Sequence, residues 1–354
     1  MNATFPPPRV RNPRRRPLPM PLVGLVVLCA LCQPTRSLLG DEPGKAAASQ
    51  PARPAEGEPR RRAELPEGVN RVLFLGDSIT YSGQYVALVE AYFVTRHPGR
   101  RVEFVNVGLP SETVSGLSEE GHADGQFPRP DLHERLGRVL EKVKPDLVFA
   151  CYGMNDGIYQ PLDEERFGKF RDGIERLHAA VEQAGVKAVH LTPPPFDGTR
   201  FAAGDEANYD RVLARYAEWL LERRGDGWDV VDLHGPMNDF LAARRQDDPA
   251  FALAGDGVHP GELGHWLMAN QVLLHLGAED LAKAEDGQAM LAAHPHGPAV
   301  FELLRQRQDL MRDAWLTETK HARPGINPGP PLAEAGEKAA DLDAKIDELA
   351  GARG

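Results

Sequence analysis

The sequence predicts a three-layer α/β/α sandwich built on a five-stranded parallel sheet, followed by a C-terminal helical extension. Five short apolar runs alternate along the chain with five longer segments whose apolar residues recur at helical spacing. The runs are apolar throughout rather than at every second position, as a strand covered on both faces requires. Strands that alternate with helices in this way form a parallel sheet with right-handed crossovers.

The expected strands are short and rich in β-branched residues. They are RVLFLG at 71–76, VEFVNV at 102–107, DLVFAC at 146–151, VKAVHL at 186–191 and WDVVDL at 228–233. The expected helices lie between and after them, at 84–96, 131–143, 163–184, 206–224 and 261–276. Leu213, Tyr216 and Leu220 illustrate the helical spacing. Because such sheets place their chemistry at the carboxyl ends of the strands, we expect a site at that edge.

Unusual polar and glycine-rich clusters follow each expected strand. They are Gly76-Asp77-Ser78, Gly108, Gly153-Met154-Asn155-Asp156, Pro193–Asp197 and the stretch Gly255–Pro260 before the last helix. A serine hydroxyl is a weak nucleophile unless a base takes its proton, and the base usually needs a third group to hold it. Asp256 and His259, three residues apart on one loop, can supply both roles for Ser78. The backbone N–H groups of Ser78 and Gly108 and the amide of Asn155 are candidates to stabilise the resulting oxyanion.

Each of these residues also has an ordinary structural interpretation. Asp77-Ser78 could start a helix as its cap, and Gly108 could serve a turn. Asn155-Asp156-Gly157 is a good turn sequence. Asp256-Gly257 is a turn dipeptide, and Pro260 stands at the favoured first position of a helix. Because all of these clusters should meet at one edge of the sheet, a catalytic site is favoured over separate turns.

Four blocks of the sequence also carry a family resemblance. They are GDSIT at 76–80, Gly108 within NVGLPSET, GMND at 153–156 and DGVHP at 256–260. In their order and approximate spacing, over about residues 70–276, they resemble the SGNH/GDSL hydrolase family. The resemblance implies a flavodoxin-like sandwich and an esterase or lipase that needs no cofactor.

The same resemblance implies a role for each site residue. Ser78 would be the nucleophile and Asp256 and His259 the other members of a catalytic triad. Ser78, Gly108 and Asn155 would supply the oxyanion hole. Ser111 departs from the pattern, because many members have a second glycine there, which puts the shape of this loop in question.

Other residues are weaker candidates. Cys151 could rival Ser78, but it closes an apolar strand and is expected to be a buried small residue. His265 is expected to pack in the core. His294 and His296 lack a nearby carboxylate or cysteine to complete a metal site, so no metal is expected. Candidates for the rim of a substrate cleft, with ordinary packing as the alternative, are His122, Asp124, Phe196, Arg200, Phe201 and Trp266.

The N-terminal segment has the composition of an export signal. Residues 1–20 hold several arginines and no acid, and the apolar run PLVGLVVLCALC follows at 21–32. This pattern predicts a signal peptide over residues 1–37 and therefore a periplasmic or secreted protein. Cys32 raises a lipid anchor as the less favoured alternative.

The rest of the chain divides into three expected parts. Residues 38–64 are rich in Pro, Ala, Gly and charge and predict a disordered linker. Residues 65–280 would form the hydrolase domain. Residues 281–354 would form the helical extension, whose two apolar stripes, within 300–315 and 335–349, are expected to pack on the core.

The charge of the chain limits its partners. Residues 1–37 hold six arginines and no acid, so without them the net charge of −11 becomes −17. A chain this acidic should repel nucleic acid and anionic membrane surfaces. We therefore expect a small-molecule or carbohydrate ester as the substrate, no nucleic-acid partner and no stable membrane insertion of the mature chain. The oligomeric state stays open.

These observations predict an exported serine esterase that forms an acyl-enzyme. The loops at 110–130 and 193–208 hold no long apolar stretch to bind a fatty chain, which favours a short acyl ester, such as acetyl, on a carbohydrate. A lipase or lysophospholipase, or an acyltransferase, using the same triad is the alternative within the enzymes. A non-catalytic carbohydrate-binding protein on a hydrolase-like fold is the alternative outside them.

Overall fold

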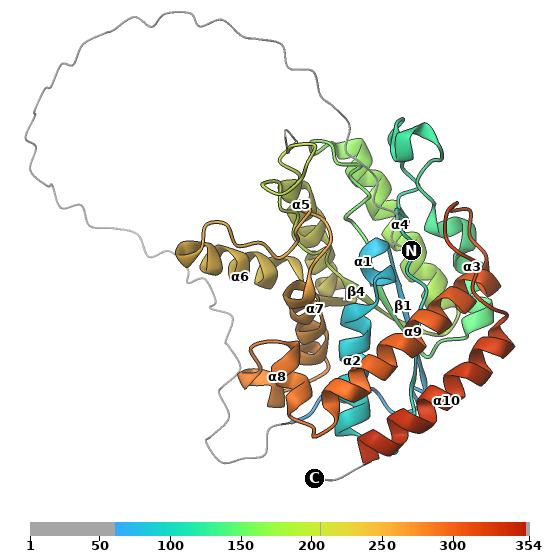
Figure 1. The fold of residues 1–354 in the computed structure, drawn as a ribbon. Helices are drawn as coiled ribbons and strands as arrows, with labels where there is room; N and C mark the ends of the chain where they lie inside the picture. The colour runs from blue at the N-terminus through green and yellow to red at the C-terminus, as the bar shows by residue number, and fades with distance from the viewer. Residues whose placement is uncertain (1–60, 206, 352–354) are drawn as a thin grey trace, which may run out of the picture. The chain divides into compact units, whose positions relative to one another are not determined.

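The fold is a doubly wound parallel sheet. The computed structural model describes residues 61–205 and 207–351, so the expected signal peptide at 1–37 and most of the expected linker lie outside the described residues. All strands of the sheet are parallel, in the order β2-β1-β3-β4-β5 (Figure 1). This is the strand order of flavodoxin-like proteins, so the predicted fold class is confirmed. The strands are β1 (Arg71–Gly76), β2 (Glu103–Asn106), β3 (Leu147–Cys151), β4 (Lys187–Leu191) and β5 (Asp229–Val231).

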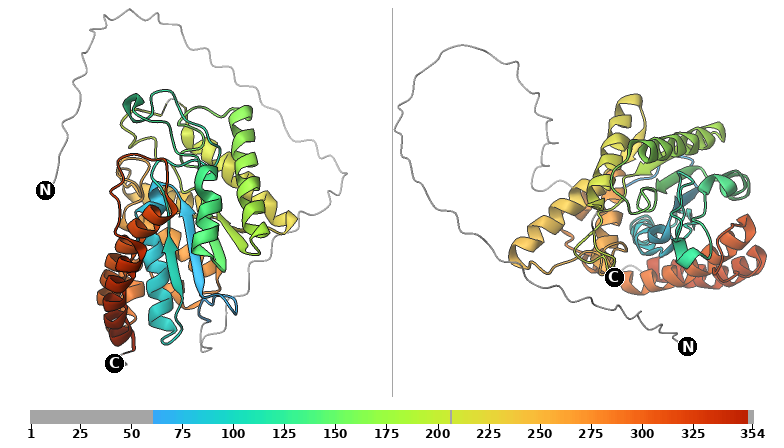
Figure 2. Two further views of the ribbon diagram at one scale, coloured as in Figure 1. Left: turned by 90° about the vertical axis from the view of Figure 1, so that its right-hand side faces the viewer. Right: turned by 90° about the horizontal axis from the view of Figure 1, so that it is seen from above.

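Helices cover both faces of the sheet. α2 and α7 pack together on one face, and α3 and α4 pack together on the other (Figure 2). The helices of the sandwich are α1 (Ser78–Tyr81), α2 (Gln84–Arg96), α3 (Leu132–Val143), α4 (Glu164–Gln183), α5 (Tyr209–Glu222), α6 (His234–Asp247) and α7 (Glu262–His275). The extension holds α8 (Gly287–Ala292), α9 (Gly297–Thr319) and α10 (Leu332–Gly351), and short 3-10 turns lie at His122–Gly125, Arg223–Asp226 and Asp280–Lys283. Within the described ranges, no helix combines the length and apolarity that crossing a bilayer requires.

Most of these elements lie where the sequence predicts them. α2 has the predicted bounds, and α3, α4 and α7 differ from them by one residue at their ends. α6 was not predicted, because it begins His-Gly-Pro and only His234, Met237 and Leu241 of its residues are buried. Three buried positions give too faint a helical period to detect. α1 is a single turn, shorter than the window in which periodicity can be seen.

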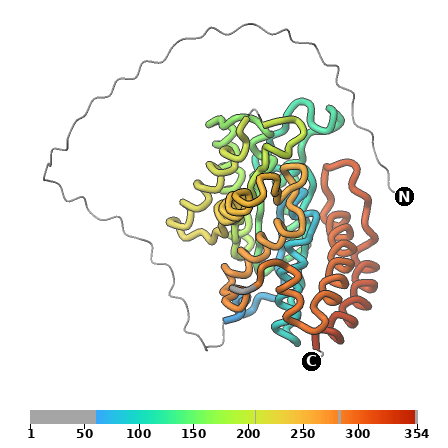
Figure 3. Tube along the Cα trace, turned by 60° about the vertical axis from the view of Figure 1, so that its left-hand side comes forward, coloured from blue at the N-terminus to red at the C-terminus, as the bar shows by residue number. Residues whose placement is uncertain are grey.

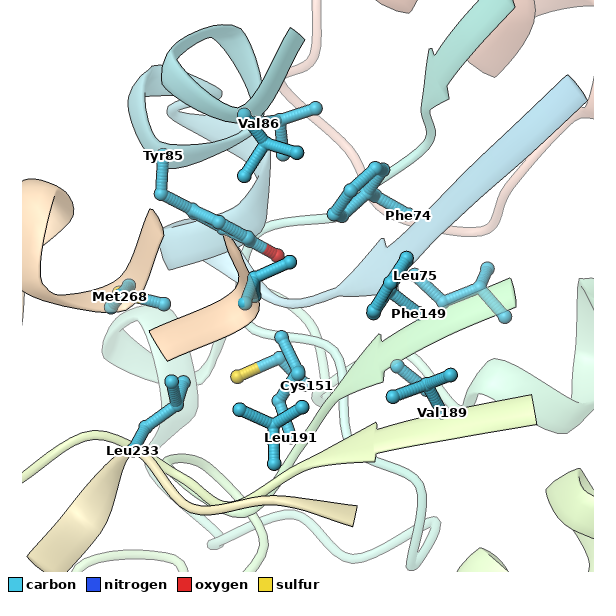
Figure 4. Close-up of a cluster of buried hydrophobic side chains, with 14 of the residues drawn as sticks. Phe74, Leu75, Tyr85, Val86, Phe149, Cys151, Val189, Leu191, Leu233 and Met268 are labelled. Carbon is cyan, nitrogen blue, oxygen red and sulfur yellow. The ribbon is translucent and has the colours of Figure 1, made fainter. Parts of the chain in front are cut away.

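The core between the sheet and the α2–α7 layer is tightly filled (Figure 4). Every residue of β3 is buried, which explains its continuous apolarity. Cys151 ends this strand within the core, and burial raises the pKa of its thiol well above the usual range. A thiol held protonated is a poor nucleophile, so the interpretation of Cys151 as a buried small residue is confirmed.

Two aromatic residues considered for the rim of a cleft belong to the core instead. Trp266 is 1% exposed and Phe196 is 4% exposed, so neither presents a face to a ligand. The rim prediction is therefore wrong for both. Phe201 is partly buried and stacks on Tyr159 with ring centres 5.3 Å apart.

The extension packs on the sandwich as the sequence predicts. α9 contacts α2 and the edge strand β2, and α10 lies along α9 (Figure 3). Glu90 of α2 is 1% exposed and accepts hydrogen bonds from Arg307 and, at 2.6 Å, from Nε2 of Gln308, both on α9. Burial raises the pKa of Glu90, and Arg307 opposes that shift. Polar as well as apolar contacts therefore join the extension to the sandwich.

A pair of histidines is enclosed beside the other edge of the sheet. His190 on β4 is fully buried, and its Nε2 lies 3.1 Å from Nδ1 of His178 on α4. The ring of Trp228 stacks on both imidazoles. Burial lowers the pKa of His190 to about 3; His178 lowers it further and Asp229 opposes the shift. The neutral form of His190 is therefore the one that the fold accepts.

We expect the contribution of His190 to stability to decrease as the pH falls below about 6.5, the ordinary pKa of an unfolded histidine. A histidine whose pKa is lower when folded binds its proton preferentially in the unfolded state. Its contribution is present above that pH and is lost as the pH falls toward 3. One such group changes the free energy of unfolding by up to about 1.4 kcal/mol per pH unit.

Urea unfolding between about pH 7.5 and about pH 4 measures this dependence. His190→Leu, which has no group to titrate, should flatten the curve, while His296→Gln on the exposed surface serves as the matched control. Equal slopes for wild type and His190→Leu would contradict the prediction.

Candidate active site

The turn after β1 presents Ser78 at the carboxyl edge of the sheet. Asp77 follows the strand, and its Oδ1 accepts the N–H of Ile79 at 2.9 Å, which caps α1. Ser78 is the first residue of that helix and is partly exposed. A Cβ on Gly76 would lie 2.2 Å from Oγ1 of Thr80, so only glycine allows this close approach. The capping interpretation of Asp77 is correct, and the cap also fixes the position of Ser78.

Ser78, His259 and Asp256 form one hydrogen-bonded chain. Oγ of Ser78 lies 2.8 Å from Nε2 of His259, and Nδ1 of that ring lies 2.7 Å from Oδ2 of Asp256. Ser78 and His259 are 181 positions apart in the sequence, whereas His259 and Asp256 are three apart. The structure thus brings together the three residues that the sequence predicts as a triad.

The environment of Asp256 determines how His259 is protonated. Oδ1 of Asp256 accepts the backbone N–H groups of Val258 and His259 at 2.9 and 2.8 Å. Partial burial raises the pKa of Asp256, but the hydrogen bonds from His259 and from this backbone outweigh it and the pKa is lowered. The ionised carboxylate can only accept, so Nδ1 of His259 carries the proton. Nε2 is then free to accept the hydroxyl proton of Ser78.

The loop after β4 holds this segment in place. Gly257 has φ 84° and an added Cβ would lie 2.5 Å from the carbonyl oxygen of Asp197, so glycine is required between Asp256 and His259. The N–H of Asp197 donates to the carbonyl of Gly257 at 2.8 Å, and its carboxylate pairs with Arg245. The cluster after the fourth strand therefore positions the triad loop.

Gly108 packs directly against the helix that begins at Ser78. A Cβ at this position would lie 2.4 Å from the backbone nitrogen of Tyr81, so glycine is needed here. The N–H of Gly108 donates to Oδ1 of Asn106 at 2.8 Å, while Nδ2 of Asn106 donates to the carbonyl of Thr80 at 2.7 Å. The predicted oxyanion donor thus already has a partner, and an oxyanion would have to share it.

Asn155 is buried in the turn after β3 with a defined set of partners. Its Oδ1 accepts from Nη1 of Arg129 at 2.9 Å and from the hydroxyl of Tyr159 at 3.4 Å. Its Nδ2 donates to the carbonyl of Glu112 at 3.2 Å, which uses one of two amide hydrogens. The second hydrogen can serve another acceptor.

The loop after β2 is fixed by a buried carboxylate and one strained residue. Oδ1 of Asp156 accepts the N–H groups of Val114 and Ser115 at 2.9 and 2.8 Å. Burial raises the pKa of Asp156 to about 6, and these hydrogen bonds oppose the shift. Ser111 has φ 69°, in the left-handed region that favours glycine. The loop therefore keeps the backbone conformation of a glycine despite the serine.

The remaining rim candidates have more limited roles. Nδ1 of His122 lies 3.3 Å from Oε1 of Glu119, whereas Asp124 is exposed with φ 56°. Arg200 donates to the carbonyl of Ala250. His265 is buried in α7 and contacts Oγ of Ser82 at 3.1 Å, in agreement with its expected packing role.

Sequence reasoning missed the residues that hold the site together. These are Asn106, Glu119, Arg129, Tyr159 and Arg245. His122 and Asp124 of the loop that carries Arg129 are rim candidates in the sequence, but nothing there distinguishes Arg129 from a solvated arginine. A Ser–His–Asp chain at the carboxyl edge of a doubly wound sheet is an arrangement that serine hydrolases use.

Comparison with known proteins establishes the family. Residues 74–267 match the model of the GDSL-like Lipase/Acylhydrolase family. The match spans more than half of the chain, and the chain belongs to this family. It is a carboxylic ester hydrolase.

Individual relatives are more distant. An acetylxylan esterase from Geobacillus stearothermophilus is 27% identical over 237 residues, which are 59% of this chain and 94% of that protein. The solved structure of a catalytic mutant of an acetylxylan esterase from the same organism matches with a TM-score of 0.47 and 22% identity, over 61% of this chain and 97% of that one. A gut microbial diltiazem-metabolizing enzyme matches with a TM-score of 0.46 and 24% identity, over 62% of this chain and 48% of that chain, about half of its length.

Proposed function

We propose that this protein is an exported serine esterase that removes short acyl groups, acetyl above all, from a carbohydrate through an acyl-enzyme. One observation carries the catalytic part of the proposal, the hydrogen-bonded chain from Ser78 through His259 to Asp256. The chain has the geometry in which a base activates a serine and a carboxylate holds the base.

In the first half-reaction, Oγ of Ser78 attacks the ester carbonyl carbon while Nε2 of His259 takes the hydroxyl proton. The tetrahedral intermediate collapses when the bond between the carbonyl carbon and the alcohol oxygen breaks. His259 returns its proton to the departing alcohol, and the acyl group stays on Ser78 as an ester. Asp256 keeps its charge throughout and stabilises the imidazolium that forms beside it.

In the second half-reaction, water attacks the acyl carbon and His259 takes a proton from it. The bond to Oγ of Ser78 then breaks, the serine regains its proton and the carboxylic acid leaves. Both intermediates carry an oxyanion, for which Nδ2 of Asn155 and the N–H of Ser78 are the proposed donors. The N–H of Ser78 is the first of its helix, where backbone donors have no partner within the helix. Gly108 contributes as a donor shared with Asn106.

The openness of the triad supports a carbohydrate as the alcohol, and the neighbouring loops and a relative support a short acyl group. The side chains of His259 and Asp256 are 51% and 56% exposed, so a bulky, hydrated alcohol can reach them. The neighbouring loops hold no long apolar stretch to cover a fatty chain. A relative that is 27% identical is an acetylxylan esterase.

A series of p-nitrophenyl esters from acetyl to palmitoyl tests this preference. We expect kcat/KM to peak at acetyl or propionyl and to fall roughly 100-fold by octanoyl, because each added methylene that does not fit costs binding free energy. Acetylated xylo-oligosaccharides should release acetate with the same enzyme. A profile that rises with chain length, together with activation by micelles, would favour a lipase or lysophospholipase.

The export part of the proposal rests on sequence alone. Residues 1–37 combine an arginine-rich start with a short apolar run, as signal peptides do. N-terminal sequencing of protein recovered outside the cytoplasm tests it, and a chain that still begins at Met1 there would contradict cleavage.

A further inference from the structure

An ion pair lies directly behind Asn155. Arg129 is 8% exposed, and its Nε and Nη2 donate to the two carboxylate oxygens of Glu119, each at 2.7 Å. Its remaining terminal nitrogen, Nη1, donates to Oδ1 of Asn155 at 2.9 Å. The guanidinium carbon lies 5.4 Å from the centre of the Tyr159 ring. Glu119 thus holds Arg129 as a two-pronged clamp and directs its third nitrogen at Asn155.

Stability alone does not account for this pair. Burial lowers the pKa of Arg129, but the hydrogen bonds to Glu119 outweigh it and the pKa is raised. Partial burial raises the pKa of Glu119, but the bond from Arg129 outweighs it and the pKa is lowered. Both groups are therefore charged at neutral pH. Removing charges from water costs about as much as their attraction returns, so a buried pair is weak evidence for stabilisation.

The pair does determine how the amide of Asn155 is oriented. A side-chain amide can be turned over, which exchanges its oxygen and nitrogen. Arg129 can only donate, so the end of Asn155 that faces it must be Oδ1. The opposite end is then Nδ2, the donor that an oxyanion needs. Without Arg129 the two orientations would differ only by the weaker contacts to Glu112 and Tyr159.

The positive charge also changes the strength of that donor. A charged donor on Oδ1 draws electron density from the amide and makes its N–H groups better donors, as in any polarised hydrogen-bond chain. The effect grows when an oxyanion forms, because charge then lies at both ends of the amide. A contribution of this kind acts on the transition state more than on the bound ester.

We propose that Arg129, clamped by Glu119, is a positioning residue that orients and polarises Asn155 for oxyanion stabilisation. This inference rests on the proposed function, in which Nδ2 of Asn155 is an oxyanion donor. Loss of one such donor costs about 10²- to 10³-fold in turnover. Loss of Arg129 leaves the amide in place but unfixed, so a smaller loss is expected.

The test compares kcat and KM for p-nitrophenyl acetate in full-length variants. Arg129→Met is expected to lower kcat/KM by about 10- to 100-fold with little change in KM. The reason is that Arg129 helps Asn155 to stabilise the oxyanion, which exists in the transition state and not in the bound ester. Arg129→Lys, which keeps one charged donor without the fork, should recover part of the loss.

Arg96→Met is the matched control. Like Arg129, Arg96 pairs with a carboxylate, that of Asp280 at 3.2 Å, and its guanidinium carbon lies 4.8 Å from the ring centre of a tyrosine, Tyr92. It stands at the far end of α2 from the turn that presents Ser78. Arg96→Met should change kcat/KM by less than about twofold, although its thermal stability will fall.

A double-variant cycle separates the inference from the function on which it rests. In an Asn155→Ala background, Arg129→Met should cause no further loss, because Arg129 acts only through that amide. The inference, but not the proposed function, would be overturned if the losses in kcat/KM of the two single variants multiplied in the double variant. The same holds if Arg129→Met were as active as wild type while Asn155→Ala was impaired. Full activity of Asn155→Ala would overturn the oxyanion assignment itself.

A boronic acid gives a second readout. Ser78 would add to the boron of phenylboronic acid and form a tetrahedral anion with an oxygen in the proposed oxyanion hole. Its Ki should rise in Arg129→Met by the same factor by which kcat/KM falls. An unchanged Ki beside a reduced kcat/KM would overturn the inference. If Arg129→Met does not fold, Glu119→Gln, which loosens the clamp but keeps Arg129, should show the same pattern to a smaller extent.

Discussion

The Ser78→Ala variant should lose ester hydrolysis by about 10³-fold or more while remaining folded. The loss is large because the members of a triad act as a unit, and the hydroxyl of Ser78 is the one that lies 2.8 Å from Nε2 of His259. Ser78 is partly exposed at the edge of the sheet, so its hydroxyl contributes little to packing. Initial rates on p-nitrophenyl acetate, with thermal unfolding of the same preparation, measure both effects.

Ser82→Ala is the matched control for this variant. Ser82 lies one turn further along, and its hydroxyl donates to the carbonyl of Ile79 and contacts His265. Its removal should leave activity within a few fold of wild type. A fluorophosphonate probe should label wild type and Ser82→Ala but not Ser78→Ala. Labelling or turnover that persists in Ser78→Ala would assign the nucleophile elsewhere.

Asp256→Asn should lower kcat/KM by about 10²- to 10⁴-fold through the tautomer of His259. An asparagine amide can donate to Nδ1, which moves the ring proton to Nε2 and leaves no acceptor for the hydroxyl of Ser78. Asp256 is half exposed, so water can partly replace its carboxylate as the partner of His259. We therefore expect the loss in kcat/KM to lie below the upper end of this range. Nitrogen NMR of the imidazole should show the proton on Nδ1 in wild type and on Nε2 in the variant.

Asp248→Asn makes the same chemical change at an exposed carboxylate, which within the described part of the chain accepts only the N–H of Ala250. It should retain full activity. An Asp256→Asn enzyme that keeps wild-type kcat/KM would show that the loop alone holds His259. The assignment of Asp256 to the triad would then be wrong.

The parts of the site that could be predicted are those whose signal is local in the sequence. Ser78 follows an apolar strand, and Asp256 and His259 are three residues apart, so each was visible without knowledge of the fold. The supporting residues were not visible, because each acts through a distant partner. Arg129 meets Asn155 across 26 positions and Asp197 meets Arg245 across 48. No periodicity records such contacts.

As with the site, the elements of the fold that could be predicted are those with a local signal in the sequence. Strands covered on both faces can be predicted because they are apolar at every position. Long amphipathic helices can be predicted because their apolar residues recur at helical spacing. α6 was missed because few of its residues face the core. The partner of the Gly108 N–H could not be foreseen either, since Asn106 lies inside a predicted strand and its side chain folds back only in the finished turn.

The packing of α9 has a practical consequence for anyone who divides this chain. The family match ends at residue 267, but α9 covers the open side of the edge strand β2 and supplies the partners of Glu90. A fragment cut at the end of the match would expose the hydrogen-bonding groups of β2, a template for self-association. Arg312 of α9 also donates to the carbonyl of Tyr81, within the turn that carries Ser78. The smallest piece worth expressing, crystallising or grafting therefore includes all of α9, well past residue 267, where the family match ends.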